Sequence, residues 1–319
     1  MSWAGAGPAT IRIAGPIDSL SLSAFGGSVA IHAAVEDGCS QSGVLWSPPA
    51  RKPVPLKDAC SNDASYETLT LAGSTAIWWD YDAGNHVYCS DVYVTSLTHV
   101  APHGLGVCDG TEGDTYYEFA GDRSIVAAAD YSVCEADCTG ANGKLLPDGD
   151  YGVEVRRLVG HKLVPLLKPV NFRTFLDAAN WRVAVDEPND VLAVYDSAGK
   201  KLWSRPGVNA DAGWIVGNTV VVQHERTVRD YSSRSAGPAR TLPKGGRVTD
   251  VLGGIAVYTA GSALHLLRLS DGRDRVLVTV KGLSDAQITP AGVFYGVVPK
   301  TYDGVVTFVP LAQALRRLA

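Results

Sequence analysis

Six cysteines have the clearest chemistry in this chain, and all of them lie in its first half. They are Cys39, Cys60, Cys89, Cys108, Cys134 and Cys138. A structural zinc site would need paired Cys-x-x-Cys or Cys/His spacing, whereas residues 134 and 138 form a lone Cys-x-x-x-Cys. An even number of cysteines confined to one region is typical of disulfides made in an oxidising compartment. We therefore expect an exported protein, secreted or in the cell envelope; structural zinc and free core thiols are the alternatives.

The segment CDGTEGD, residues 108–114, could bind a hard cation. Its carboxylates are Asp109, Glu112 and Asp114, and its glycines would let oxygen ligands converge as calcium requires. The segment lacks the Asp-x-Asp-x-Asp-Gly order of a dedicated calcium loop, and solvated turns are the alternative. Asp80, Asp82 and Asn85 in the segment DYDAGN, residues 80–85, come nearer to that order, but they fit a hairpin turn after a strand equally well. Calcium at Asp109, Glu112 and Asp114 is the one cofactor that we consider.

Motifs of the common enzyme classes are missing. The chain has no Gly-x-Ser-x-Gly, no His-Glu-x-x-His and no phosphate-binding loop. His99 and His103 have the spacing of a helical ligand pair, but Pro102 denies them a helix. His32 and His224 fall in predicted strands, where we expect core or cavity histidines. These absences argue against the common enzyme classes and leave other catalytic chemistry open.

Composition restricts the function classes further. The 319 residues are 46% hydrophobic and 19% charged, with a net charge of −5, which excludes disorder, collagen and a generally basic nucleic-acid binder. No run of 18 apolar residues occurs, so no membrane span is predicted. Residues 1–160 carry 20 acidic and 8 basic side chains, against 13 and 20 in residues 161–319. The imbalance indicates either two solvated surfaces or an acidic patch for a cation or basic partner.

One phrase recurs along the chain: apolar residues, a turn containing Gly, Ala or Asn, and then β-branched or aromatic residues. It occurs seven times, as SAFGGSVAIH, LAGSTAIWW, FAGDRSIVAA, LDAANWRVAV, IVGNTVVV, VLGGIAVY and ITPAGVFYGV. Seven units in this length give about 46 residues per unit, the size of a propeller blade. Most units are followed by sequence for further strands. The repeat predicts an all-β, seven-bladed β-propeller with about four strands per blade.

The repeat also predicts the blade boundaries in a single domain. They are roughly 18–60, 66–108, 114–170, 174–206, 209–244, 247–281 and 284–310. The last unit is one strand short, and residues 10–17 (TIRIAGPI) can supply the missing outer strand and close the ring. Residues 311–318 (LAQALRRL) read as a short amphipathic helix.

The predicted blades give the cysteines a common location. In a propeller, the loops between the second and third strands of each blade open on the same face as the connections between blades. Cys39 and Cys60 flank this region of blade 1, and Cys89 and Cys108 are equivalent in blade 2. Cys134 and Cys138 lie in a long insertion of blade 3. We expect bridges 39–60, 89–108 and 134–138, each contributing about 2–4 kcal/mol.

The seven units resemble the TolB-like and WD40-like propellers of exported bacterial proteins. The ending, DAQITPAGVFYG followed by VVTFVPLAQALRRL, is similar to the closing segment of actinobacterial members. Trp79-Asp80 is a lone Trp-Asp pair, without the Gly-His of a WD40 blade. The resemblance implies a fold and a tendency to bind proteins or small ligands, and it implies no catalytic residues.

These observations favour a non-enzymatic exported scaffold, which we expect to be a monomer. It would bind a protein, a small molecule or a glycan on the disulfide-stapled loop face. Aromatic residues of blades 2 and 3 could take part: Trp78, Trp79, Tyr81, Tyr88, Tyr93, Tyr116 and Tyr117. The alternative is a hydrolase or lyase in the central pocket. Close carboxylates or histidines with shifted pKa values in the channel would favour that enzyme.

Overall fold

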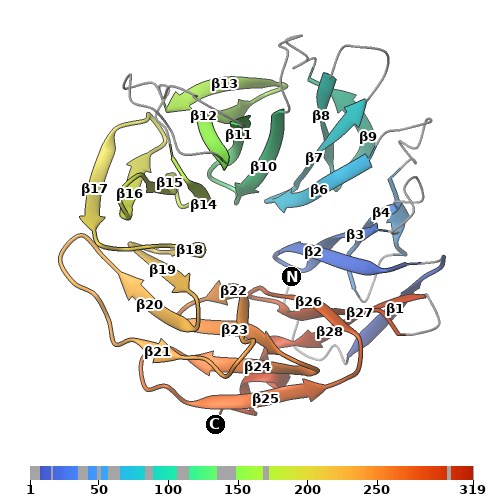
Figure 1. Ribbon diagram of the computed structural model, residues 1–319. Coiled ribbons are helices and arrows are strands. Elements are labelled where there is room, and N and C mark those ends of the chain that lie inside the picture. The colour runs from blue at the N-terminus through green and yellow to red at the C-terminus, as the bar shows by residue number, and fades with distance from the viewer. Residues whose placement is uncertain are drawn as a thin grey trace.

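Seven four-stranded antiparallel sheets surround a central channel in the computed structural model (Figure 1). The structure describes residues 8–15, 17–34, 42–48, 52–56, 65–82, 89–105, 115–134, 149–167, 172–299 and 303–318. In six of these sheets the strand nearest the channel is followed outward by the next three strands in chain order. The predicted seven-bladed propeller with four strands per blade is confirmed.

The first three blades contain the strands that follow residue 18. Blade 1 is built from β2 (Ser19–Phe25), β3 (Ser28–Ala34), β4 (Ser42–Trp46) and β5 (Val54–Pro55). Blade 2 is built from β6 (Ser65–Ala72), β7 (Thr75–Asp82), β8 (Cys89–Ser96) and β9 (His99–Gly104). Blade 3 is built from β10 (Thr115–Gly121), β11 (Val126–Cys134), β12 (Gly149–Val159) and β13 (Lys162–Leu167).

The next three blades follow the same order. Blade 4 is built from β14 (Thr174–Ala179), β15 (Arg182–Glu187), β16 (Val191–Asp196) and β17 (Lys201–Pro206). Blade 5 is built from β18 (Ala212–Val216), β19 (Thr219–His224), β20 (Thr227–Tyr231) and β21 (Arg240–Thr241). Blade 6 is built from β22 (Arg247–Leu252), β23 (Ile255–Ala260), β24 (Ala263–Arg268) and β25 (Asp274–Thr279).

Blade 7 joins the two ends of the chain, as the incomplete last repeat predicts. Its strands are β26 (Leu283–Ile288), β27 (Gly292–Val297), β28 (Gly304–Pro310) and, as the outermost strand, β1 (Ala9–Ile13). The β1 strand pairs with β28 from Ala9 opposite Phe308 to Ile13 opposite Gly304. The ring is therefore closed by hydrogen bonds rather than by a covalent link.

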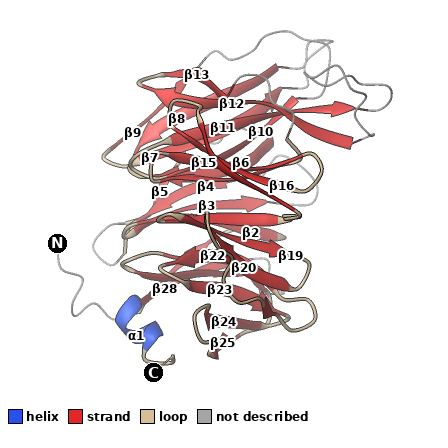
Figure 2. Ribbon diagram, turned by 90° about the vertical axis from the view of Figure 1, so that its left-hand side faces the viewer, coloured by secondary structure: helices blue, strands red, loops and turns tan. Residues whose placement is uncertain are grey.

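The predicted C-terminal helix is α1 (Leu311–Leu315), at one edge of the disc (Figure 2). It ends earlier than residue 318, but Ala314 and Leu318 are both buried against blades 6 and 7. Among the described residues, no helix has the length and apolar character needed to cross a membrane.

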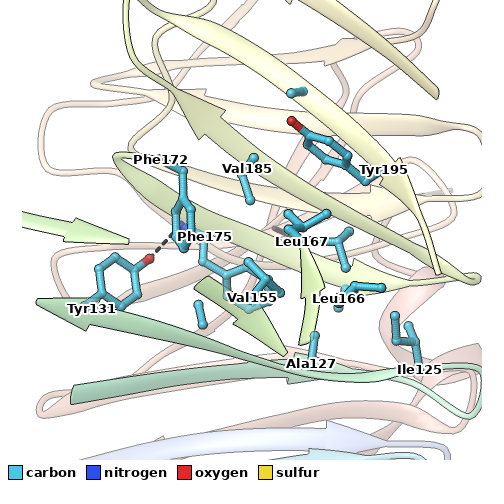
Figure 3. Close-up of a cluster of buried hydrophobic side chains, with 14 residues drawn as sticks. Ile125, Ala127, Tyr131, Val155, Leu166, Leu167, Phe172, Phe175, Val185 and Tyr195 are labelled. Carbon is cyan, nitrogen blue, oxygen red and sulfur yellow. Dashed lines mark hydrogen bonds between the residues drawn. The ribbon is translucent and has the colours of Figure 1, made fainter. Parts of the chain in front are cut away.

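The hydrophobic core lies between adjacent blades. The second strand of a blade supplies runs of small and β-branched residues, such as RVAVDE in β15, whose four central residues are buried. Figure 3 shows one such cluster between blades 3 and 4, where Val155, Leu167 and Phe172 pack against Phe175 and Val185. Face-to-face packing of this kind holds the inner strands at the channel in a fixed arrangement.

Candidate functional site

A cavity of about 900 Å³ opens at the end of the channel where the first and second strands of each blade meet. We call this end the A–B end, and the opposite end, where the second and third strands meet, the B–C end. Residues from the inner strands of all seven blades line the cavity, from Ser21 in β2 to Gln287 in β26. The volume lies within the range of small-molecule sites in proteins.

Three aspartates occupy equivalent places in the inner strands of blades 4, 6 and 7. They are Asp177 in β14, Asp250 in β22 and Asp285 in β26. In each blade the pairing register shifts at the residue just before the aspartate, which indicates a β-bulge. A bulge re-aims a side chain, and here each carboxylate reaches the neighbouring blade.

The three carboxylates make the same two hydrogen bonds. The Oδ1 atom accepts the N–H of the following residue at 2.7 Å, from Ala178, Val251 and Ala286 respectively. The Oδ2 atom accepts an N–H from the inner strand of the next blade, from Ile215 at 2.7 Å, Ile288 at 2.8 Å and Leu22 at 2.8 Å. The inner strands are edge strands, whose channel-side N–H groups have no partner in their own sheet. The aspartates supply the missing acceptors.

Other side chains connect the remaining blades. The Ser23 hydroxyl accepts the Leu71 N–H between blades 1 and 2, and the Thr70 hydroxyl donates to the Phe119 carbonyl between blades 2 and 3. Between blades 3 and 4 the Tyr131 hydroxyl accepts the Phe175 N–H at 2.6 Å (Figure 3), and between blades 5 and 6 Gln223 Oε1 accepts the Val248 N–H at 2.7 Å. Each of the seven junctions thus carries a side-chain hydrogen bond to the backbone.

The electrostatics of the channel are unusual. Burial raises the pKa of Asp177 and Asp285 to about 6 and that of Asp250 to about 7. The charge of Asp122 adds to the rise in the pKa of Asp177, and the charges of Asp177 and Asp285 add to the rise for Asp250. The N–H donors act in the opposite direction, and Arg247 also lowers the pKa of Asp285. The carboxylates therefore repel one another across a partly enclosed space.

These shifted pKa values meet the condition that would favour an enzyme, but the hydrogen bonds give a structural reason for them. Every oxygen of Asp177, Asp250 and Asp285 already accepts a backbone N–H, and each carboxylate joins two blades. A general acid or base needs an oxygen directed at the substrate. The geometry accordingly favours blade connection as the main role of these residues.

Replacing Asp285 with alanine should lower the free energy of unfolding by about 1–2 kcal/mol at pH 5, because the Leu22 and Ala286 N–H groups lose their acceptor. At that pH the carboxyl is largely neutral, so the loss reports the hydrogen bonds rather than the charge. Urea unfolding measures it. Asp303→Ala is the control, because its 3.9 Å ion pair with Arg12 is exposed and should contribute under about 1 kcal/mol. Equal losses in the two variants would contradict the assigned role.

The residues that the sequence nominated lie away from this cavity or outside the described ranges. Asp109, Glu112 and Asp114, nominated for calcium, are outside, as are Cys39, Cys60, Cys108 and Cys138. Cys89 begins β8 and Cys134 ends β11, which places their backbone at the B–C end. Within the described ranges, no group of three or more His, Cys, Asp or Glu side chains could hold a metal ion.

Packing accounts for several of the nominated aromatic residues. Trp78, Trp79 and Tyr117 are almost fully buried, and Trp78 stacks on Tyr93 with ring centroids 5.7 Å apart. Trp181, which the sequence did not nominate, is in contrast 62% exposed. The sequence signal for it was the replacement of turn glycines by Asn180-Trp181 in the fourth repeat.

One histidine prediction is confirmed and one is wrong. His32 is buried in β3 as expected. His224 is not a core histidine: its side chain is 43% exposed and lies 3.3 Å from Asp211. The reason is its place at the end of β19, where the strand leaves the interblade packing for the turn into β20.

The fold and the channel define a seven-bladed β-propeller with a polar cavity at one end. No protein-family model matches the chain, and no curated protein matches it by sequence. Similar solved structures include KlHsv2 with loop 6CD replaced by a Gly-Ser linker, with a TM-score of 0.56, 9% identity and 88% of each chain covered. YCF48 from Cyanidioschyzon merolae has a TM-score of 0.53 and 9% identity over 95% of this chain and 98% of that one. Identities this low establish the fold alone.

Proposed function

We propose that this chain is a non-enzymatic binding propeller that takes a small ligand in the cavity at the A–B end of its channel. The cavity itself carries the proposal: seven inner strands enclose about 900 Å³ and leave it open to solvent at one end. The lining combines backbone edges, hydroxyls and carboxylates with the rings of Phe25 and Trp214. Mixed linings of this kind bind ligands by shape and by a few directed polar groups.

The proposal includes the compartment and a second surface. Export is supported by the cysteine count, and the resemblance to TolB-like bacterial propellers agrees with it. The loops at the B–C end, stapled by the expected disulfides, are the proposed surface for a protein partner. Loops held by a rigid scaffold commonly carry binding residues. A calcium ion at Asp109, Glu112 and Asp114 would belong to this second surface.

A thermal-melt screen tests the cavity proposal. The panel contains amines, sugars, common cofactors, calcium and a chelator. A ligand at 100 times its dissociation constant adds about 2.7 kcal/mol, which for a chain of this length raises Tm by about 4 °C.

Two variants locate the binding site. Ser21 lines the cavity, so Ser21→Phe should abolish the shift, whereas Ser19→Phe, two residues earlier on the same strand and outside the lining, should retain it. A flat panel, or a shift that survives Ser21→Phe, would contradict the proposal. A shift with calcium that the chelator reverses would instead support the acidic loop.

The second candidate function is a hydrolase or lyase in the same pocket. One observation favours it: the pKa values of Asp177 and Asp250, about 6 and about 7, suit general acid–base chemistry near neutral pH. The two hydrogen bonds at each carboxylate weigh against it, because they already occupy both oxygens. Turnover of any panel ligand that is lost in Ser21→Phe would reverse this preference.

A further inference from the structure

Trp181 is the most exposed of the large apolar side chains in the described part of the chain, and its backbone is held in place at the cavity rim. It forms the two-residue turn between β14 and β15 with Asn180, which lines the cavity. Both residues have positive φ, 53° and 59°. In the equivalent turns of blades 1, 2, 5 and 6, the residue that aligns with Asn180 is a glycine with positive φ: Gly26, Gly73, Gly217 and Gly253. A tryptophan at this position is unusual because positive φ disfavours bulky side chains.

Blade 3 fixes this turn. The Asn180 N–H donates to Asp122 Oδ2 at 2.9 Å, and the Trp181 N–H donates to Ser124 Oγ at 2.8 Å. The Asp122 Oδ1 atom accepts the Ser124 N–H at 2.7 Å, which orders the receiving loop. Hydrogen bonds to blade 3 therefore fix the backbone of both turn residues, while the indole ring of Trp181 is largely exposed to solvent.

The cavity next to this turn has more acidic than basic side chains in its lining. Asp122, Asp177 and Asp250 line it, and among the described lining residues Arg123 is the only lysine or arginine. The Arg123 guanidinium lies over the Phe25 ring, 5.4 Å from its centroid. Asp285 lies outside the lining but adds to the rise in the pKa of Asp250, and Arg247 acts on Asp285. A cation entering the cavity would relieve the repulsion among the carboxylates.

We propose that the A–B cavity recognises an alkylammonium group, with Trp181 covering the alkyl chain or the charged head at the rim. The inference rests on the proposed binding function and names its ligand class. Each oxygen of Asp177 and Asp250 already accepts one backbone N–H, so neither carboxylate has two free oxygens. A guanidinium binds a carboxylate best through two parallel hydrogen bonds, whereas an ammonium is a compact charge that needs only one, so an ammonium fits this site better. Tryptophan is also the strongest cation–π partner. The ammonium can come from a free polyamine or from a lysine side chain.

Calorimetric titration distinguishes these sources and tests the charge. The probes are spermidine, Nα-acetyl-lysinamide and, as a neutral match, Nα,Nε-diacetyl-lysinamide; maltose represents neutral sugars. Binding of spermidine alone identifies a free polyamine, and binding of acetyl-lysinamide identifies a lysine side chain. The diacetylated probe should not bind. The amine affinity should fall at least about tenfold from pH 8 to pH 5, because Asp177 and Asp250 take up protons over that interval.

Variants test the two parts of the site. Trp181→Ala should weaken amine binding about fivefold or more, whereas Leu202→Ala, an exposed apolar residue on the outer strand β17, should have no effect. Ser21→Lys places an ammonium of the protein itself in the cavity and should abolish amine binding, and Ser19→Lys should not.

Three results would overturn the inference. They are the absence of amine binding at about 10 mM probe, a concentration that would detect a Kd in the millimolar range; binding of the diacetylated probe as tight as that of the amines; and unchanged amine binding in Trp181→Ala. Binding of maltose without amines would overturn the ligand class but retain the binding function. Failure of every probe in this and the thermal panel would overturn both.

Discussion

Deletion of residues 1–14 should lower the free energy of unfolding by about 4 kcal/mol or more, because it removes β1 and reopens the ring at blade 7. The lost pairing with β28 runs over the whole of β1, and the deletion also removes the buried side chain of Ile13 and the partly buried Ile11. The exposed edge of β28 should then cause aggregation that increases with protein concentration. Urea unfolding and light scattering measure the two effects.

Adding the missing strand in trans provides the control for this deletion. A peptide of residues 8–15, PATIRIAG, should restore part of the lost stability by pairing with β28. The same peptide with Ile13→Asp should fail, because this position is buried in the blade 7–blade 1 cluster. If the deleted protein keeps its stability, or if both peptides restore it equally, β1 is not the closing element that its pairing indicates.

The second large effect is a loss of stability as the pH rises from 5 to 8. Asp177 and Asp285 have pKa values of about 6 and Asp250 of about 7, and burial also raises the pKa of Asp186 to about 6. Unfolded aspartate ionises near pH 4, so over this interval the folded state holds protons that the unfolded state has released. Stability from these groups is complete at acid pH and is lost through pH 6–7. We expect a decrease of about 6 kcal/mol, or about 9 °C in Tm.

Asp186→Asn is the informative variant for this pH dependence. Asp186 is fully buried in β15, and Arg173 only partly opposes the rise in its pKa. Removing its charge should raise stability at pH 8 by about 1–2 kcal/mol and change little at pH 4.5. Asp303→Asn, at an exposed ion pair, should leave the profile unchanged. A stability maximum between pH 7 and 8 in the unmodified protein would contradict the raised pKa values.

The architecture could be predicted because the repeated phrase is a local feature. Each of the seven copies spans the turn between the first and second strands of a blade, as in β2–β3 and β22–β23. Turn residues and β-branched runs act over a few neighbours, so a single sequence records them directly. The closing strand was predicted for a related reason: the last repeat lacked one strand, and residues 10–17, before the first repeat, could supply it.

The cavity and its charges could not be predicted in this way. Asp177, Asp250 and Asp285 belong to different repeats, and their likeness depends on bulges that shift each side chain toward the next blade. A bulge changes the face of the sheet to which a side chain points. It alters the alternation of apolar and polar residues too little to be recognised in a single sequence. The burial of His224 was mispredicted for a similar reason. The sequence places it in a strand, but it does not show that the end of this strand lies outside the packed interface between blades.

The sequence by itself determined the propeller, the number of blades and the way in which the ends meet, because these follow from local turn chemistry and from counting strands. Only the tertiary structure decided that distant aspartates converge on one channel, that their pKa values rise together, and that Trp181 stands at the rim. Convergence around an axis brings together residues that are far apart in the chain. Their burial and mutual repulsion exist only once all seven blades are in place.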